Sequence, residues 1–94
     1  MKPSEEKAIL AIAEIVRDSV AMNDAALAGD FDEARFRVQL IVAKADAAGQ
    51  RDLLLTAAHL MRTLGPAGTD PGPGYGAGML RVANALDKIG FTRL

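Results

Sequence analysis

Glycines divide most of this chain into segments that each carry a helical repeat of apolar residues. Gly29, Gly49 and Gly65 each follow such a segment, and a glycine after an amphipathic run is typical of a helix C-terminus. Within the segments, apolar residues recur at spacings of three and four, and none of the runs alternates as a half-buried strand does. The pattern therefore predicts an all-α protein.

The spacing predicts four helices. They cover about residues 4–28, 31–48, 51–64 and 77–89. The connections between the first three are short, which favours antiparallel neighbours, whereas the Gly/Pro-rich residues 65–76 predict a long loop before the last helix. A chain of 94 residues has room for one domain. We expect a single helical domain over residues 1–94, folded as an antiparallel four-helix bundle.

Apolar positions also predict which face of each helix is buried. In the first helix this face is expected to contain Ile9, Ile12, Ala13, Val16, Val20 and Leu27, with Ala8, Ile15 and Met22 on its flank. In the second helix it is expected to contain Phe31, Ala34, Val38, Ile41, Ala45 and Ala48. Asp18 is expected on the solvent side of the first helix, because it falls outside the predicted apolar face.

A second apolar stripe lies opposite the core face of the second helix. Its members are Phe36, Leu40, Ala43 and Ala47. A helix that is apolar on two faces lies either at the centre of a protein or at an interface. The stripe favours a twofold homodimer formed through this helix. The alternative is that the second helix buries both faces inside the bundle.

Composition narrows the class of function. The 11 basic and 12 acidic residues leave a net charge of −1, without the basic excess of a nucleic-acid-binding protein. The absence of cysteine excludes disulfides and thiolate zinc sites. Apolar runs fall short of the roughly 20 residues that a membrane helix needs, and the abundance of Arg, Ala and Gly favours a GC-rich bacterial genome. We expect a bacterial, cytoplasmic protein without a cofactor or metal.

The residues around the only histidine are similar to a known phosphoacceptor motif. Ala58-His59-Leu60-Met61-Arg62 resembles the motif of histidine phosphotransfer domains, where an apolar residue and a Lys follow an exposed His by two and three positions. These domains are small cytoplasmic antiparallel helical bundles. The resemblance implies that His59 accepts a phosphoryl group and that Arg62 stabilises it. Thr63 stands where the family usually has Gly, and Gly65-Pro66 ends the helix early.

A second alignment to the same family covers a longer stretch. The matching residues are Leu27-Ala28-Gly29-Asp30-Phe31, Ala34-Arg35, Gly49, Leu53 and Ala57. In this alignment Gln39 occupies the place of the phosphoacceptor histidine. It therefore implies a relative that is not phosphorylated and only binds partners.

The Gly/Pro-rich loop offers two further hypotheses. Gly72, Gly74 and Ala77 form a loose phosphate-binding pattern before a helix, but the preceding strand that such sites require is not predicted. We therefore interpret the loop as a flexible connection. Tyr75, the only tyrosine, is expected to fix the loop to the protein surface or to contact a partner. A small ligand bound between the bundle and the loop is a weaker alternative.

The sequence thus favours a non-catalytic helical interaction or regulatory module. We expect it to act as a homodimer, with itself as the first partner and another protein as the second, and not with nucleic acid or a membrane. The alternative function is a phosphorelay protein that uses His59.

Overall fold

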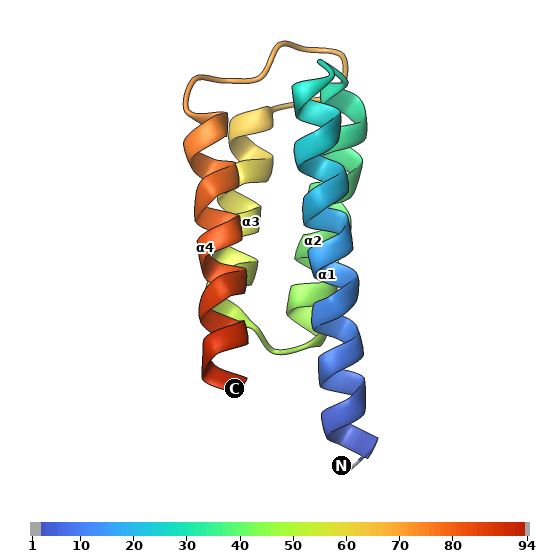
Figure 1. Ribbon diagram of the computed structural model, residues 1–94. Helices are drawn as coiled ribbons and strands as arrows, with labels where there is room; N and C mark the ends of the chain where they lie inside the picture. The colour runs from blue at the N-terminus through green and yellow to red at the C-terminus, as the bar shows by residue number, and fades with distance from the viewer. Residues whose placement is uncertain (1–2, 94) are drawn as a thin grey trace.

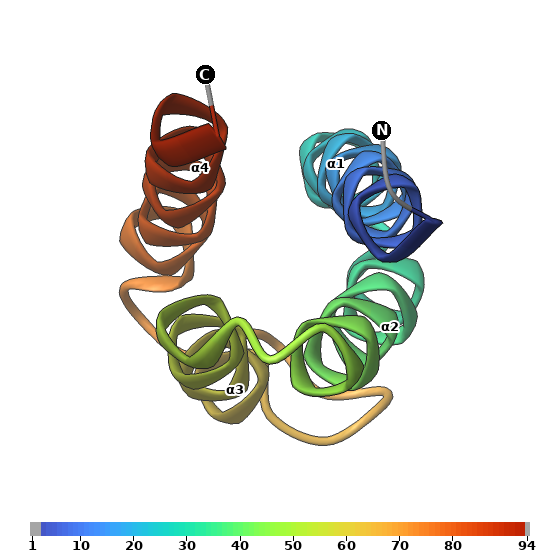
Figure 2. The same cartoon turned by 90° about the horizontal axis from the view of Figure 1, so that it is seen from below.

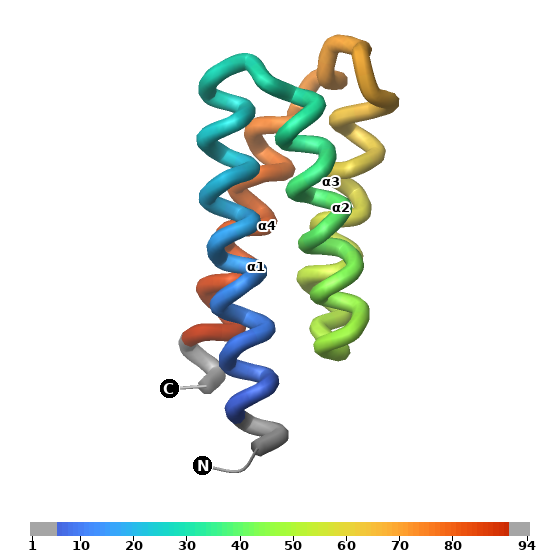
Figure 3. Tube along the Cα trace, turned by 90° about the vertical axis from the view of Figure 1, so that its right-hand side faces the viewer, coloured from blue at the N-terminus to red at the C-terminus, as the bar shows by residue number. Residues whose placement is uncertain are grey.

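The computed structural model describes the backbone of residues 3–93 and the side chains of residues 6–90. Its helices are α1 (Pro3–Leu27), α2 (Phe31–Ala47), α3 (Arg51–Leu64) and α4 (Tyr75–Arg93). Residues 3–93 contain no strand, so the all-α prediction is confirmed. The chain doubles back after each helix, and the helices lie side by side along their length (Figure 1; Figure 3).

Two turns of one design join the first three helices. In the first turn, Gly29 has a φ of 78°, a conformation that glycine adopts without the steric cost of a Cβ. Asp30 donates its amide to the carbonyl of Ala25 at 2.8 Å, which completes a Schellman motif at the end of α1. Its carboxylate then caps α2 by accepting the amide of Glu33 at 3.1 Å. The second turn repeats the backbone pattern around Gly49.

α4 departs most from its predicted bounds of 77–89. It begins two residues earlier, at Tyr75, and runs on to Arg93, because Gly90 does not adopt the positive φ that would end the helix there. Gly78 is buried inside this helix. A Cβ at Gly78 would lie 3.0 Å from Cδ1 of Leu60, so the glycine permits the close approach of α4 to α3.

The core lies where the inner faces of the four helices meet. Its largest fully buried side chains are Ile15, Met22, Ile41, Leu53, Leu60, Leu64, Val38 and Val82. On α2 the predicted core face is largely confirmed, because Ala34, Val38, Ile41 and Ala45 are buried. Buried apolar area of this kind is the main favourable contribution to folding.

α1 turns a different face inward from the one predicted. Ile15 and Met22, which were expected on the flank, are fully buried. Four side chains of the predicted core face are instead between 44% and 87% exposed: Ile9, Val16, Val20 and Leu27. The prediction of the buried face of α1 was therefore wrong.

An ion cluster around the buried Asp18 lies between α1 and α2 and accompanies this rotation. Asp18, expected on the solvent side, is buried, and its carboxylate accepts a hydrogen bond from Nζ of Lys44 at 2.7 Å. Nη1 of Arg37 lies 3.3 Å from the same carboxylate. A carboxylate is stable at low exposure only when it is paired in this way. Pairing with cations of α2 therefore allows the Asp18 side of α1 to face inward together with Ile15 and Met22.

Seen end-on, the four helices are arranged as a U, with α1 and α4 on either side of its opening (Figure 2). Consecutive helices pack closely, whereas α1 and α4 make the fewest contacts of the neighbouring pairs. The molecule is elongated, with extents of 44 × 19 × 18 Å. Within residues 3–93, no helix combines the length and the apolar character needed to cross a membrane.

Candidate functional site

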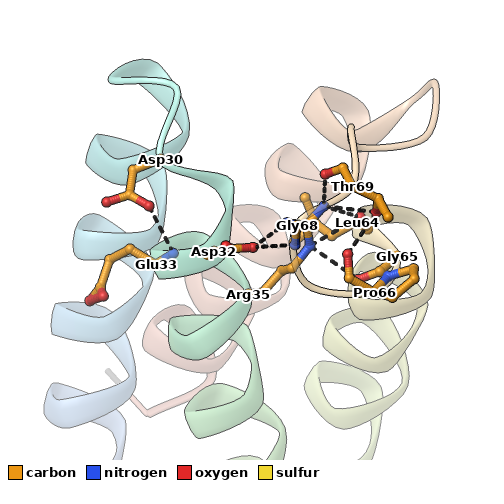
Figure 4. Close-up of polar contacts among 9 residues, drawn as sticks. All are labelled: Asp30, Asp32, Glu33, Arg35, Leu64, Gly65, Pro66, Gly68 and Thr69. Carbon is orange, nitrogen blue, oxygen red and sulfur yellow. Dashed lines mark hydrogen bonds and ion pairs between the residues drawn. The ribbon is translucent and has the colours of Figure 1, made fainter.

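Arg35 is buried at the junction of α2, the end of α3 and the loop formed by residues 65–74 (Figure 4). Its guanidinium donates from Nη2 to the carbonyl of Leu64 at 2.7 Å and to that of Thr69 at 2.5 Å, and from Nε to that of Gly65 at 3.1 Å. A helix leaves such carbonyls without a partner at its C-terminus, where a cation also complements the helix dipole. Arg35 thus caps α3 and ties the loop to α2.

Asp32 completes this arrangement, which we call the Arg35–Asp32 clamp. Its Oδ1 accepts hydrogen bonds from Nη1 of Arg35 at 2.6 Å and from the amide of Gly68 at 2.9 Å. The Gly68 amide, followed by the Arg35 side chain, holds the pKa of Asp32 below its ordinary value of 3.8. The ionised carboxylate therefore fixes the first half of the loop at neutral pH.

The second half of the loop is held as well. The amide of Gly72 donates to the carbonyl of Thr63 at 2.8 Å. The ring of Tyr75, the first residue of α4, meets the ring of Phe31 edge to face with centroids 5.3 Å apart. The segment interpreted from sequence as a flexible connection is thus bonded to α2 and α3 at several points, and Tyr75 packs against the start of α2.

An apolar pocket lies between this loop and the end of α1. It has a volume of about 710 Å³ and is lined by Ala26 and Leu27 of α1, by residues 71–74 and by Met79 and Leu80 of α4. That volume is within the range of small-molecule sites, about 300–1,000 Å³. The clamp positions the pocket wall, because it fixes the loop that leads into α4.

The pocket adjoins an exposed apolar face of α1. We call this face the α1 stripe; it consists of Ile9, Val16, Val20 and Leu27. Ile9 and Leu27 are 18 residues apart, which is five turns of a 3.6-residue helix, so the stripe runs straight along one side. Leu80, 62% exposed on α4, lines the same pocket as Leu27. A row of exposed apolar side chains on one side of a helix is a candidate interaction surface.

The structure places the predicted α2 stripe on the surface. Phe36 is 51% exposed, with its ring centroid 5.8 Å from Cζ of Arg37. Leu40 is half-buried, and Ala43 and Ala47 are exposed. This stripe therefore offers one large exposed side chain, fewer than the α1 stripe. The alternative of complete internal burial is wrong.

His59 and Arg62 are both exposed, one turn apart on α3. Thr63 donates from Oγ1 to the carbonyl of His59 at 3.1 Å, so the hydroxyl is directed at the helix backbone. Within the part of the chain that the structure describes, groups of three or more His, Cys, Asp or Glu that could hold a metal are not found.

Sequence reasoning missed Arg35, whose signal was present in the pattern. Arg35 occupies the apolar face of α2 beside Ala34 and Val38, which are buried. A charged residue within an apolar face indicates a buried polar partner. The partner itself could not be named, because the carbonyl of Leu64 lies 29 residues away along the chain.

Comparison of the chain with protein-family models, curated proteins and solved structures finds no match in any of the three.

Proposed function

We propose that this protein is a non-catalytic interaction module of the bacterial cytoplasm, built as an antiparallel four-helix bundle that acts as a homodimer. The observation that carries this proposal is the α1 stripe, four large apolar side chains exposed along one straight side of α1. Burying such a side chain is worth about 1.5–3 kcal/mol. Because these side chains are 44–87% exposed in one copy, a monomer would forgo the corresponding part of that free energy at each position.

The charge balance supports association with protein. A net charge of −1 allows two copies to approach without strong mutual repulsion. Exposed apolar side chains on α1, α2 and α4 add to the surface available for contact: Ile9, Leu10, Val16, Val20, Leu27, Phe36 and Leu80. Two faces are available for a dimer, the α1 stripe and the α2 stripe.

Light scattering coupled to gel filtration tests this function. The wild-type protein is expected to have the mass of two chains of 9.9 kDa. The Val16→Asp, Val20→Asp pair tests the α1 stripe, and the Phe36→Asp, Leu40→Asp pair tests the α2 stripe. Circular dichroism identifies any variant that has unfolded. A wild type that stays monomeric at millimolar concentration contradicts the proposal.

A second candidate function is phosphoryl acceptance by His59. It is favoured by the exposure of His59 and Arg62 one turn apart. In this reaction an imidazole nitrogen attacks the phosphorus of an aspartyl phosphate, and the bond to the aspartyl oxygen breaks as the N–P bond forms. Incubation with phosphorylated response regulators is then expected to give an acid-labile label on the wild type and none on His59→Ala. An unlabelled wild type excludes this candidate.

A third candidate is the binding of a small apolar ligand. It is favoured by the volume and lining of the pocket beside Leu27 and Leu80. In a thermal-shift screen of small apolar compounds, a bound compound is expected to raise the unfolding temperature of the wild type. The unfolding temperature of Ala83→Phe, in which the larger side chain narrows the pocket, is expected not to change. A flat screen counts against it.

A further inference from the structure

We infer that the α1 stripe binds the α1 stripe of a second copy, with the two helices antiparallel about a twofold axis. In this arrangement α1 of each copy lies along the open side between α1 and α4 of the other. The inference rests on the proposed homodimer and names its surface.

The spacing of the stripe is the same from either end. Successive members, Ile9, Val16, Val20 and Leu27, are seven, four and seven residues apart. In an antiparallel pair centred at the level of residue 18, Ile9 meets Leu27 of the second copy and Val16 meets its Val20. Twofold symmetry requires such self-complementarity, because each residue and its partner must exchange roles. A different protein would not need to share this spacing.

The same antiparallel register brings two exposed, oppositely charged residues of α1 together across the two copies. Arg17 and Asp24 follow the flank of the stripe away from Ala26, which lines the pocket, and within residues 6–90 neither forms an ion pair. In the antiparallel pair, Arg17 lies about 7.5 Å along the axis from Asp24 of the second copy. Helical side chains lean toward the N-terminus, so these two lean toward each other. Symmetry produces the pair twice.

The pocket receives the start of α1 from the second copy. At the end of α1, Ala26 and Leu27 line the pocket. The register brings Ile9 and Ile12 of the second copy to this level, on the flank that faces α4. Ile12 is half-buried and Ile9 is 46% exposed within one copy, so the contact removes further apolar surface from water. The same contact therefore covers the pocket.

Disulfide trapping tests the register, since the chain contains no cysteine of its own. Ile9→Cys and Leu27→Cys are prepared separately and then mixed under mild oxidation. The mixture is expected to form a disulfide-linked dimer. Each variant alone is expected to run as a monomer on a non-reducing denaturing gel, because equivalent residues lie about 27 Å apart in the pair. Disulfides require Cα separations of about 4.4–6.8 Å.

A charge exchange tests the flank. Arg17→Asp is expected to weaken dimerisation about tenfold, because each ion pair becomes a repulsion between carboxylates. The Arg17→Asp, Asp24→Arg double variant is expected to restore the wild-type affinity. The matched control is Arg81→Asp on α4, an exposed charge outside the register.

The outcomes separate the inference from the proposed function. A monomeric wild type overturns both. A dimeric wild type whose mixed variants fail to cross-link, or whose single variants cross-link with themselves, overturns only the antiparallel α1 register. A dimer lost in Phe36→Asp, Leu40→Asp but kept in Val16→Asp, Val20→Asp assigns the interface to the α2 stripe. A folded monomer that captures an added apolar helix assigns the stripe to another protein.

Discussion

The junction of α2 with α3 and the junction of α1 with α4 are built on opposite principles. At the first, Arg35 connects α2 to the end of α3 and to the loop through hydrogen bonds to three carbonyl groups. At the second, α1 and α4 make few contacts and present exposed apolar side chains such as Val20 and Leu80. At the first junction the polar groups find their hydrogen-bond partners within the chain. At the second, apolar surface remains available for contact with another molecule.

The difference shows how a small helical protein can combine stability with a binding surface. The clamp fixes the loop after α3, and this loop determines where α4 begins. α4 can then hold its outer residues at the open side without close packing against α1. The two junctions are therefore expected to differ in energy as they differ in contacts.

The largest effect is expected from a core truncation. Leu60 is fully buried and packs against Gly78 of α4, so Leu60→Ala is expected to lower the free energy of unfolding by about 3–4 kcal/mol. Its control is Leu80→Ala, because Leu80 is largely exposed; a change within about 0.5 kcal/mol is expected there at low protein concentration. Urea denaturation measures both. Equal losses would mean that the open side is packed as firmly as the core.

Removing the clamp is expected to have the next largest effect. Arg35→Met is expected to destabilise the protein by about 3 kcal/mol, because the buried carbonyl of Leu64 loses its charged partner. Arg62→Met, at an exposed position of α3, is the matched control and is expected to change stability by less than about 0.5 kcal/mol. Chemical denaturation of both variants distinguishes a clamp from an incidental contact.

A glycine-to-alanine substitution tests whether the close approach of the second half of the loop to α3 contributes to stability. In Gly72→Ala the new Cβ would lie 2.8 Å from the carbonyl oxygen of Thr63, so the backbone must move, at a cost of about 1–3 kcal/mol. Gly90→Ala provides a control of opposite sign. No heavy atom lies within 4 Å of the added Cβ, so the helix is expected to gain about 0.5–1 kcal/mol. Thermal unfolding reports both changes.

The smallest effect is expected in the pH dependence of stability. Because the pKa of Asp32 is lowered by the Gly68 amide and by Arg35, its contribution is fully present above the ordinary value of 3.8. It is lost as the pH falls through the lowered value. Asp32→Asn is expected to remove the part of the acid dependence that begins as the pH falls below 3.8.

Urea midpoints of wild type and variant across this range measure the effect. Asp70→Asn is the control, because Asp70 lies exposed in the same loop and its carboxylate forms no hydrogen bond or ion pair within residues 6–90. Parallel curves for wild type and Asp32→Asn would show that the carboxylate does not hold the loop.

Local signals along the chain predicted much of the fold. Glycines after amphipathic runs located the helix ends near Gly29 and Gly49, where positive φ values are found. The repeat of three and four identified the buried face of α2. These signals are local, since a helix and its cap involve residues within about five positions of each other.

The candidate site was much less predictable. The α1 stripe was assigned to the core, because a single-sequence pattern cannot tell which of two apolar faces turns inward. The inward face combines buried Ile15 and Met22 with the pairing of Asp18 to Lys44, which lies on another helix. The pocket and the clamp likewise join residues that are far apart along the chain.

The sequence alone determined that the chain is helical, where most of its helices begin and end, and that it carries more apolar surface than one core requires. The tertiary structure alone decided where that surplus lies. Helix formation depends on hydrogen bonds and propensities within a few residues. The orientation of each helix depends on partners from distant segments, and here the packing of Ile15 and Met22 and the pairing of Asp18 with two cations of α2 leave the α1 stripe outside.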